Sequence, residues 1–176
     1  MKEPENLVHF KNTIMKNKYI YILSIAASII LFNCTGIYED GAELAKEKVK
    51  NISEISVDEL KSKIENNEEI LLIDVRQLNE SYKGQIDGST LIPRGTLEFN
   101  ISDEDFWMEQ FMYPPTKDST EIIIYCKSGK RGVLATESLM QLGYKNVKNL
   151  NGGYQAFNPN PDESDKIGSN SGGCGG

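Results

Sequence analysis

Short apolar runs separated by polar stretches predict the strands of this chain. The two strongest runs are EILLIDV (69–75) and EIIIYC (121–126), where apolar side chains occupy successive positions. A strand in the middle of a parallel sheet is covered on both faces and shows this pattern. The shorter runs STLIPR (89–94) and VKNL (147–150) predict two more strands, and Pro93 ends the first of these.

Two other segments repeat their apolar residues with the period of a helix. Ser56 and Glu59 have the spacing of a capping box, which predicts a helix over residues 57 to about 66. The segment 132–143 predicts a second helix, which ends at its terminal glycine. Strands that alternate with helices indicate an α/β fold with a mostly parallel sheet.

The two ends of the chain differ from this central part in composition. Residues 35–51 are charged and loosely periodic, which is typical of a tether or a short helix. Residues 158–176 are rich in glycine and polar residues and are expected to be disordered. The folded domain is therefore expected to span residues 52–157.

The first 34 residues resemble a bacterial lipoprotein signal. Lys16 and Lys18 precede an uncharged run at 19–32, and Cys34 follows almost at once. A membrane span needs about 20 apolar residues, so the run is more typical of a signal-peptide core. Met15 is an alternative start for such a signal. The resemblance implies that Cys34 carries lipid and anchors an extracytoplasmic protein, in the periplasm or the cell envelope; an uncleaved membrane anchor is the alternative.

Removal of residues 1–34 makes the chain more acidic and leaves it without histidine. Four lysines and two glutamates are lost, so the formal net charge changes from −7 to about −9. So acidic a chain is a poor partner for nucleic acid, which binds basic surfaces. Because His9 is the only histidine, Cys–His and Ser–His hydrolases and histidine-dependent zinc sites are excluded. No cofactor or metal is indicated, and the pattern sets no oligomeric state.

Cys126 ends the most apolar of the predicted strands, and KSGKR follows it. Active sites of open parallel sheets lie at the carboxyl ends of strands, which is where this thiol is expected. Lys127, Lys130 and Arg131 supply positive charge, Gly129 permits a tight turn, and a helix begins behind the loop. These features favour the thiolate, so we expect a thiol pKa below the ordinary value of about 8.5. The loop predicts a nucleophile that needs no general base; the alternative is a buried cysteine that only fills space.

Several blocks of the sequence, taken in order, resemble the rhodanese-like domain. They are DVR (74–76), Glu80, GQIDGSTLIP (84–93), YCKSGKRG (125–132) and LGYKNVKNLNGGYQAF (142–157). The resemblance covers about residues 52–157. It implies a five-stranded, mostly parallel twisted sheet with helices on both faces. Two positions depart from the family's usual residues: Gln85 replaces a histidine, and Gly132 replaces a residue that is often serine.

The resemblance implies a sulfurtransferase. A nucleophilic cysteine would take sulfane sulfur from a small donor such as thiosulfate, hold it as a persulfide and pass it to a thiol or cyanide acceptor. The expected site residues are Cys126 and Arg131 as catalytic residues, Lys127, Ser128, Gly129 and Lys130 as substrate-binding residues, and Asp74 and Arg76 as a salt bridge that supports the loop.

Two other functions stay open. Phosphatases and arsenate reductases of this scaffold have five residues between cysteine and arginine, whereas four residues separate Cys126 from Arg131. This shorter loop suits a sulfur atom better than a phosphate. The other alternative is a non-catalytic rhodanese-like domain that acts as a thiol sensor or docking module.

A second thiol lies in the tail. Cys174 is flanked by glycines and follows Phe157 by 17 residues, a tether of about 20–25 Å if flexible. We expect Cys174 to accept sulfur from Cys126 or to form a resolving disulfide with it. The alternative is an exposed cysteine without a role.

Overall fold

The computed structural model describes residues 36–160. The predicted signal with its lipidation site Cys34, the alternative start at Met15, and the tail thiol Cys174 lie outside these residues. The described part contains a five-stranded sheet with the strand order β1-β5-β4-β2-β3, in which every neighbouring pair is parallel. The strands are β1 (Ser53–Ile55), β2 (Leu71–Asp74), β3 (Thr90–Leu91), β4 (Ile122–Tyr125) and β5 (Val147–Leu150). The predicted α/β fold with a five-stranded parallel sheet is confirmed.

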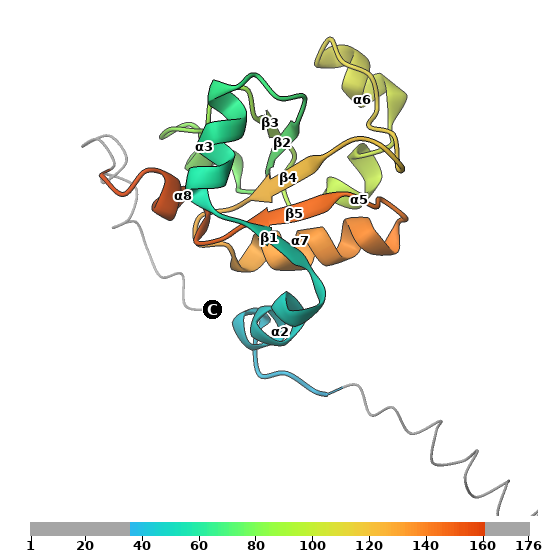
Figure 1. Ribbon diagram of the computed structural model, residues 1–176. Coiled ribbons are helices and arrows are strands. Elements are labelled where there is room, and N and C mark those ends of the chain that lie inside the picture. Colours follow the sequence, from blue (N-terminus) through green and yellow to red (C-terminus); the bar gives the residue numbers. More distant parts are fainter. Residues whose placement is uncertain (1–35, 161–176) are drawn as a thin grey trace, which may run out of the picture. The chain divides into compact units, whose positions relative to one another are not determined.

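Helices cover both faces of the sheet (Figure 1). They are α2 (Gly41–Lys48), the 3-10 turn η1 (Val49–Asn51), α3 (Val57–Glu65), α4 (Leu78–Ser81), α5 (Leu97–Asn100), α6 (Glu104–Glu109), α7 (Lys130–Gln141) and α8 (Gly153–Phe157). One hydrophobic core contains side chains of α5, α6 and α7, and the other contains side chains of α3 and α8. The sheet therefore separates two cores, which explains why β4 and the first three residues of β2 are apolar at successive positions.

The central strand β4 fixes on which face of the sheet Cys126 lies. Ile122 and Ile124 point into the core beneath α7, while Ile123 and Tyr125 point into the core beneath α3. Because side chains alternate along a strand, Cys126 falls on the α7 side, in the same core as Ile124. Cys126 therefore lies at the end of the sheet where α7 begins.

Two local signals read from the sequence have clear structural counterparts. The Ser56 hydroxyl accepts a hydrogen bond from the Glu59 N–H at 3.2 Å and caps α3. The long helix α7 begins at Lys130, two residues earlier than the apolar pattern indicated. Gly129, with φ of 88°, makes the turn that starts it, so two cationic residues belong to the first helical turn.

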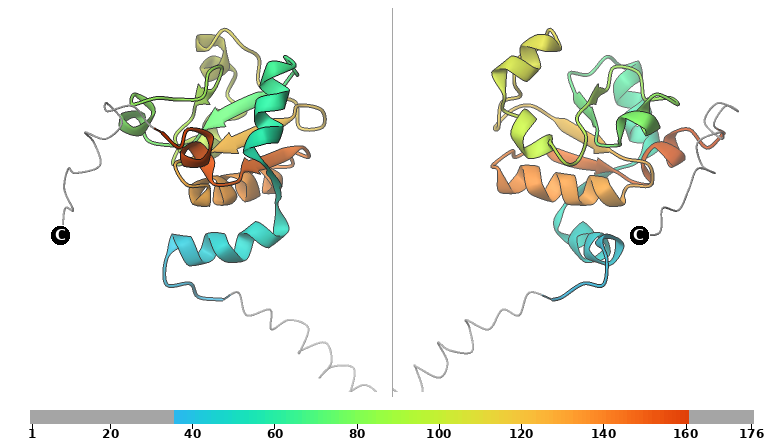
Figure 2. Two further views of the ribbon diagram at one scale, coloured as in Figure 1. Left: turned by 60° about the vertical axis from the view of Figure 1, so that its left-hand side comes forward. Right: turned by 180° about the vertical axis from the view of Figure 1, so that it is seen from behind.

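The segment before residue 52 is part of the folded unit, which begins at Tyr38. Asp40 caps α2, and Ala45 on this helix is only 2 % exposed. Lys48 forms an ion pair with Glu137 of α7 at 2.7 Å, and α2 lies beside α7 in both views (Figure 2). Of the two expectations for this segment, the structure shows the short helix. Within residues 36–160, no helix is long and apolar enough to cross a membrane.

Candidate active site

Cys126 directly follows β4 and lies at the start of a tight loop that leads into α7. The thiol is 1 % exposed. The carbonyl groups of the loop face α8: the Tyr154 N–H donates to the Cys126 oxygen at 2.8 Å, and the Gln155 N–H donates to the Lys127 oxygen at 3.0 Å. Among residues 36–160, the N–H groups of 127–131 have no hydrogen-bond acceptor. Successive unengaged N–H groups at the start of a helix stabilise negative charge, such as that of a thiolate or persulfide.

Gly153 makes this contact between α8 and the loop possible. Its φ is +60°, and a Cβ atom there would lie 2.3 Å from the Cys126 oxygen and 2.7 Å from the Gly129 nitrogen. No residue with a side chain fits such an approach. The sequence contains the signal as the Gly-Gly pair after β5, but pattern alone did not identify its partner, because Gly153 lies 27 positions after Cys126.

Arg131 is held by a carboxylate that the sequence had marked only as part of a family resemblance. Its Nη1 and Nη2 atoms donate to Glu80 at 2.7 Å each, which is a two-pronged pair. The hydrogen bond from Arg131 lowers the pKa of Glu80. Glu80 in turn raises the pKa of Arg131, and Cys126 acts in the same direction. The guanidinium therefore interacts with both Glu80 and Cys126, and Glu80 compensates part of its charge.

Asp74 and Arg76 form a buried ion pair, with 2.7 Å between Asp74 Oδ2 and Arg76 Nη2. Arg76 also donates to the Gly84 carbonyl at 2.8 Å. Its guanidinium carbon lies 4.3 Å from the centre of the Tyr154 ring. Since the Tyr154 N–H binds the Cys126 carbonyl, the pair reaches the loop through α8 rather than by direct contact.

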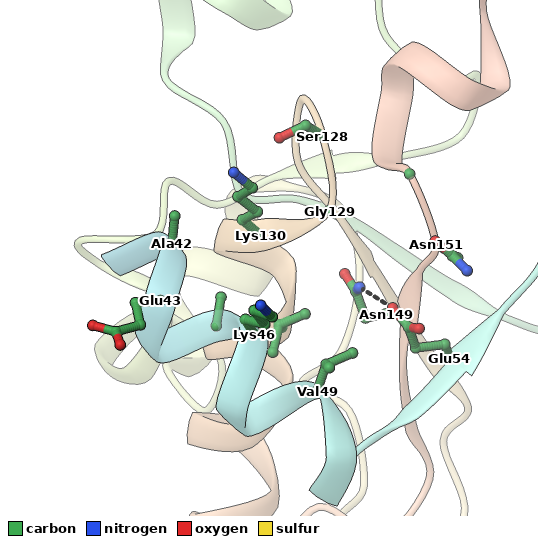
Figure 3. Close-up of a pocket in the computed structure, with 13 residues that line it drawn as sticks. Ala42, Glu43, Lys46, Val49, Glu54, Ser128, Gly129, Lys130, Asn149 and Asn151 are labelled. Atoms are coloured by element: carbon green, nitrogen blue, oxygen red, sulfur yellow. Dashed lines mark hydrogen bonds between the residues drawn. The ribbon is translucent and has the colours of Figure 1, made fainter. Parts of the chain in front are cut away.

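The remaining expected site residues differ in their exposure. Lys127, Ser128 and Lys130 are exposed around the loop, whereas Gly129 is buried against the backbone of Gly152. A pocket of about 520 Å³ lies beside the loop and is bounded by α2, the loop and the end of β5 (Figure 3). Lys127 and Lys130 are therefore open to solvent, whereas Cys126 is almost fully buried.

Residues 36–160 contain no group of three histidine, cysteine or acidic side chains that could hold a metal ion. Gln85, at the position where the family usually has histidine, accepts a hydrogen bond from Ser81 at 3.1 Å and is exposed. The fold brings the predicted nucleophile Cys126 together with the N–H groups of its loop and with Arg131.

The chain belongs to the rhodanese-like domain family, whose model matches residues 56–160. This match covers strands β2 to β5, the Cys126 loop and the contact between Gly153 and that loop, while α2, η1 and β1 lie before it. The Cys126 loop and its contact with α8 therefore lie within the family match.

Known relatives include sulfurtransferases. A sulfurtransferase of Allochromatium vinosum is 31% identical over 106 residues, which cover 60% of this chain and 88% of that protein. The human thiosulfate:glutathione sulfurtransferase is 34% identical over 89 residues, which cover 49% of this chain and 76% of that protein. The structure of a human single-domain sulfurtransferase has a TM-score of 0.56 and 29% sequence identity, and the match covers 61% of this chain and 96% of that one.

The close approach of α8 to the loop predicts that Gly153→Ala is disruptive. Its Cβ would overlap the Cys126 carbonyl, so α8 or the loop has to move. We expect a loss of about 1–3 kcal/mol in the free energy of unfolding, measured by urea denaturation. Gly95→Ala is the matched control, because its Cβ would meet nothing within 4 Å. Equal stability of the two variants would contradict the contact.

The pair between Glu80 and Arg131 predicts a pH-dependent contribution to stability. Because the pKa of Glu80 is lowered in the folded state, its stabilisation is complete above the unfolded value of about 4.3 and is lost as pH falls through the folded value. Both side chains are partly exposed, so Glu80→Gln should cost no more than about 1 kcal/mol at pH 7. Urea unfolding at pH 7 and at pH 3 should show the difference from wild type shrinking at the lower pH. A constant difference would argue against the pair.

Proposed function

We propose that this protein is a sulfurtransferase that carries sulfane sulfur on Cys126, from a donor such as thiosulfate to a thiol or cyanide acceptor. The observation that carries the proposal is the position of Cys126 inside a loop whose N–H groups have no acceptor within residues 36–160, with Arg131 beside it. The relatives named as sulfurtransferases support the same class of reaction.

The first half of the reaction loads the cysteine. The Cys126 thiolate attacks the outer sulfur of thiosulfate, a bond forms between these two sulfur atoms, and the sulfur–sulfur bond of thiosulfate breaks. Sulfite leaves with the electron pair. The exposed amines of Lys127 and Lys130 attract the dianionic donor, and the loop N–H groups stabilise the negative charge of the bound persulfide.

The second half returns the enzyme to its starting state. An acceptor thiolate, or cyanide, attacks the outer sulfur of the persulfide, and Cys126 leaves as a thiolate. The same loop N–H groups stabilise the leaving thiolate, so one set of donors serves both steps. No proton has to pass through a side chain of the site, which agrees with a loop that contains no histidine.

The phosphatase alternative is less favourable because of loop size. Four residues lie between Cys126 and Arg131, and the backbone of Gly153 packs closely against the loop. A tetrahedral phosphate needs a wider ring of donors than a single sulfur atom does. The non-catalytic alternative, a thiol sensor or docking module, makes no use of the loop's unengaged N–H groups.

Replacing the nucleophile tests the proposed reaction. We expect Cys126→Ser to lower thiosulfate-dependent transfer to cyanide or to a thiol by a factor of about 10³ or more, because oxygen cannot hold the sulfur atom. The assay follows thiocyanate or persulfide formation, circular dichroism verifies the fold, and p-nitrophenyl phosphate serves as the phosphatase substrate. Absence of transfer in the folded wild-type protein would favour the sensor or docking function, and phosphate release would favour the phosphatase.

We also propose that the domain is anchored to the outside of a bacterial membrane by lipid on Cys34. The support is the sequence of residues 1–34, with its basic start, short apolar core and cysteine. In a bacterial host, mass spectrometry should find an acylated N-terminal Cys34, and Cys34→Ser should leave the precursor unprocessed. Cys174→Ser is the matched control and should be processed normally. A Cys34→Ser protein that is cut and fractionated like wild type would refute the lipid anchor.

A further inference from the structure

A group of exposed apolar side chains lies at the end of α6, in a part of the chain that the active site does not use. Met108, Phe111, Met112 and Tyr113 are all exposed, and Phe111 is 98 % exposed. These four residues are called the α6 patch below. A single apolar side chain in water is ordinary, but several neighbouring ones are typical of a surface that another molecule covers. Aromatic residues and methionine are also enriched in protein–protein interfaces.

Phe111 occupies a backbone position that favours glycine. The helix ends in a Schellman motif, in which the Phe111 N–H donates to the Met108 carbonyl at 3.0 Å and the Met112 N–H donates to the Trp107 carbonyl at 2.9 Å. This motif places Phe111 in the left-handed region, with φ of 56°. Glycine is the usual residue there because a side chain is unfavourable in this conformation. The chain therefore combines backbone strain with solvent exposure at one phenylalanine, which points to a binding role.

Two aromatic side chains on the inner side hold the patch in place. Trp107 is fully buried, and its ring N–H donates to the Ile101 carbonyl at 2.9 Å. Phe106 packs edge-on against Trp107, with 5.3 Å between the ring centres. The Met112 sulfur accepts a weak hydrogen bond from the Thr90 hydroxyl of β3 at 3.9 Å. The exposed side chains are therefore presented by an anchored backbone, which reduces the entropy lost when a partner binds.

The surroundings of the patch are acidic. Residues 95–116 contain five acidic residues and no lysine or arginine. Within the described part of the chain, the carboxylates of Glu104, Asp105 and Glu109 form no ion pair. On the helix, Glu104 and Asp105 lie four and three positions before Met108, so their side chains are its neighbours. The patch therefore combines apolar side chains with uncompensated negative charge.

The cations that flank this segment have other partners. Arg94 forms an ion pair with Glu98 and donates to the Ser138 hydroxyl of α7 at 2.8 Å. Lys117 donates to the Leu142 carbonyl at 2.7 Å. Neither cation forms an ion pair with the carboxylates of α6. The negative charge beside the patch is therefore left for an external partner.

The patch also lies away from the Cys126 loop. Residues 110–121 lead into the start of β4, whereas Cys126 follows the end of that strand. Figure 1 and the right-hand view of Figure 2 show α6 at the opposite end of the fold from α8, which contacts the loop. A molecule bound to the patch would therefore leave the approach to the thiol open.

We propose that the α6 patch docks a protein partner whose surface presents an apolar groove lined by lysine or arginine side chains. The aromatic and methionine side chains would enter the groove, and the carboxylates of Glu104, Asp105 and Glu109 would face its basic rim. The same carboxylates disfavour an anionic membrane and a second copy of this patch, because like charges repel. The docking does not use Cys126, so this inference is independent of the proposed sulfurtransferase reaction.

The experiment uses the full chain and a model peptide with the chemistry of the proposed partner. The probe is a fluorescently labelled amphipathic helix of leucine and lysine, and the same pattern of leucine and glutamate is the control peptide. We expect the lysine peptide to bind in fluorescence anisotropy, with an affinity that falls as salt is added, and the glutamate peptide not to bind. Hydrogen exchange in the complex should slow in residues 104–113 and stay unchanged in the Cys126 loop.

Phe111→Gly separates binding from folding. We expect this variant to bind the peptide about tenfold more weakly, because the apolar side chain is lost. Its urea midpoint should nevertheless rise, because glycine suits the left-handed backbone. Tyr113→Ala should also weaken binding, and its matched control is Tyr82→Ala, an exposed tyrosine outside the patch. Glu109→Gln should lower the affinity and its salt dependence, whereas the exposed Glu65→Gln on α3 should not.

Each outcome decides the proposal. Equal binding by wild type, Phe111→Gly and Tyr113→Ala overturns the docking surface, and so does a lysine peptide that does not bind. Two further results would overturn the protein partner: phosphatidylcholine vesicles that bind wild type better than Phe111→Gly assign the patch to lipid, and a dimer that Phe111→Gly dissociates assigns it to a second copy. Cys126→Ser should bind the peptide like wild type, so failure of sulfur transfer and failure of docking are seen separately.

Discussion

A buried guanidinium is the constraint that organises the end of the sheet where the cysteine lies. Arg76 is 3 % exposed, and an unpaired charge at such a position would cost several kcal/mol. It is satisfied by Asp74 from β2, by the Gly84 carbonyl, and by the face of Tyr154 from α8. Because these partners come from three separate segments, burying the charge brings the segments together. The Tyr154 backbone then holds the Cys126 carbonyl, so the position of the reactive loop follows from how one cation is accommodated.

Much of the fold could be predicted from local pattern, and the reason is visible in β4. Its four residues are buried on both faces, so the sequence had to be apolar at each position, and the nucleophile follows directly. The Ser56 cap of α3 was equally local. The pattern could not predict contacts between residues that are far apart in the sequence. Glu80 and Arg131 are 51 positions apart, and a charge in the sequence does not say which opposite charge it meets.

The helix α2 illustrates a second limit. Its residues are charged and only weakly periodic, so the sequence allowed either a tether or a short helix. Packing decides between them: Ala45 is buried and Lys48 pairs with Glu137 on α7. Tertiary contact therefore stabilises a helix whose own sequence gives little support. The same packing forms one side of the pocket next to the loop, so a helix that precedes the family match shapes the surroundings of that loop.

The compensation of Arg131 by Glu80 has a consequence for how the site would choose its donors. Both terminal nitrogens of the Arg131 guanidinium already bind Glu80, so this group has little capacity to recognise the geometry of an incoming anion. Anion recognition would then depend on the amines of Lys127 and Lys130. These are hydrated point charges on flexible side chains, and they recognise charge without a fixed geometry. Selectivity among donors would then come from the narrow approach to a thiol that is 1 % exposed. Under the proposed function, such a site would attract many anions and would react only with those whose terminal sulfur can reach the thiol.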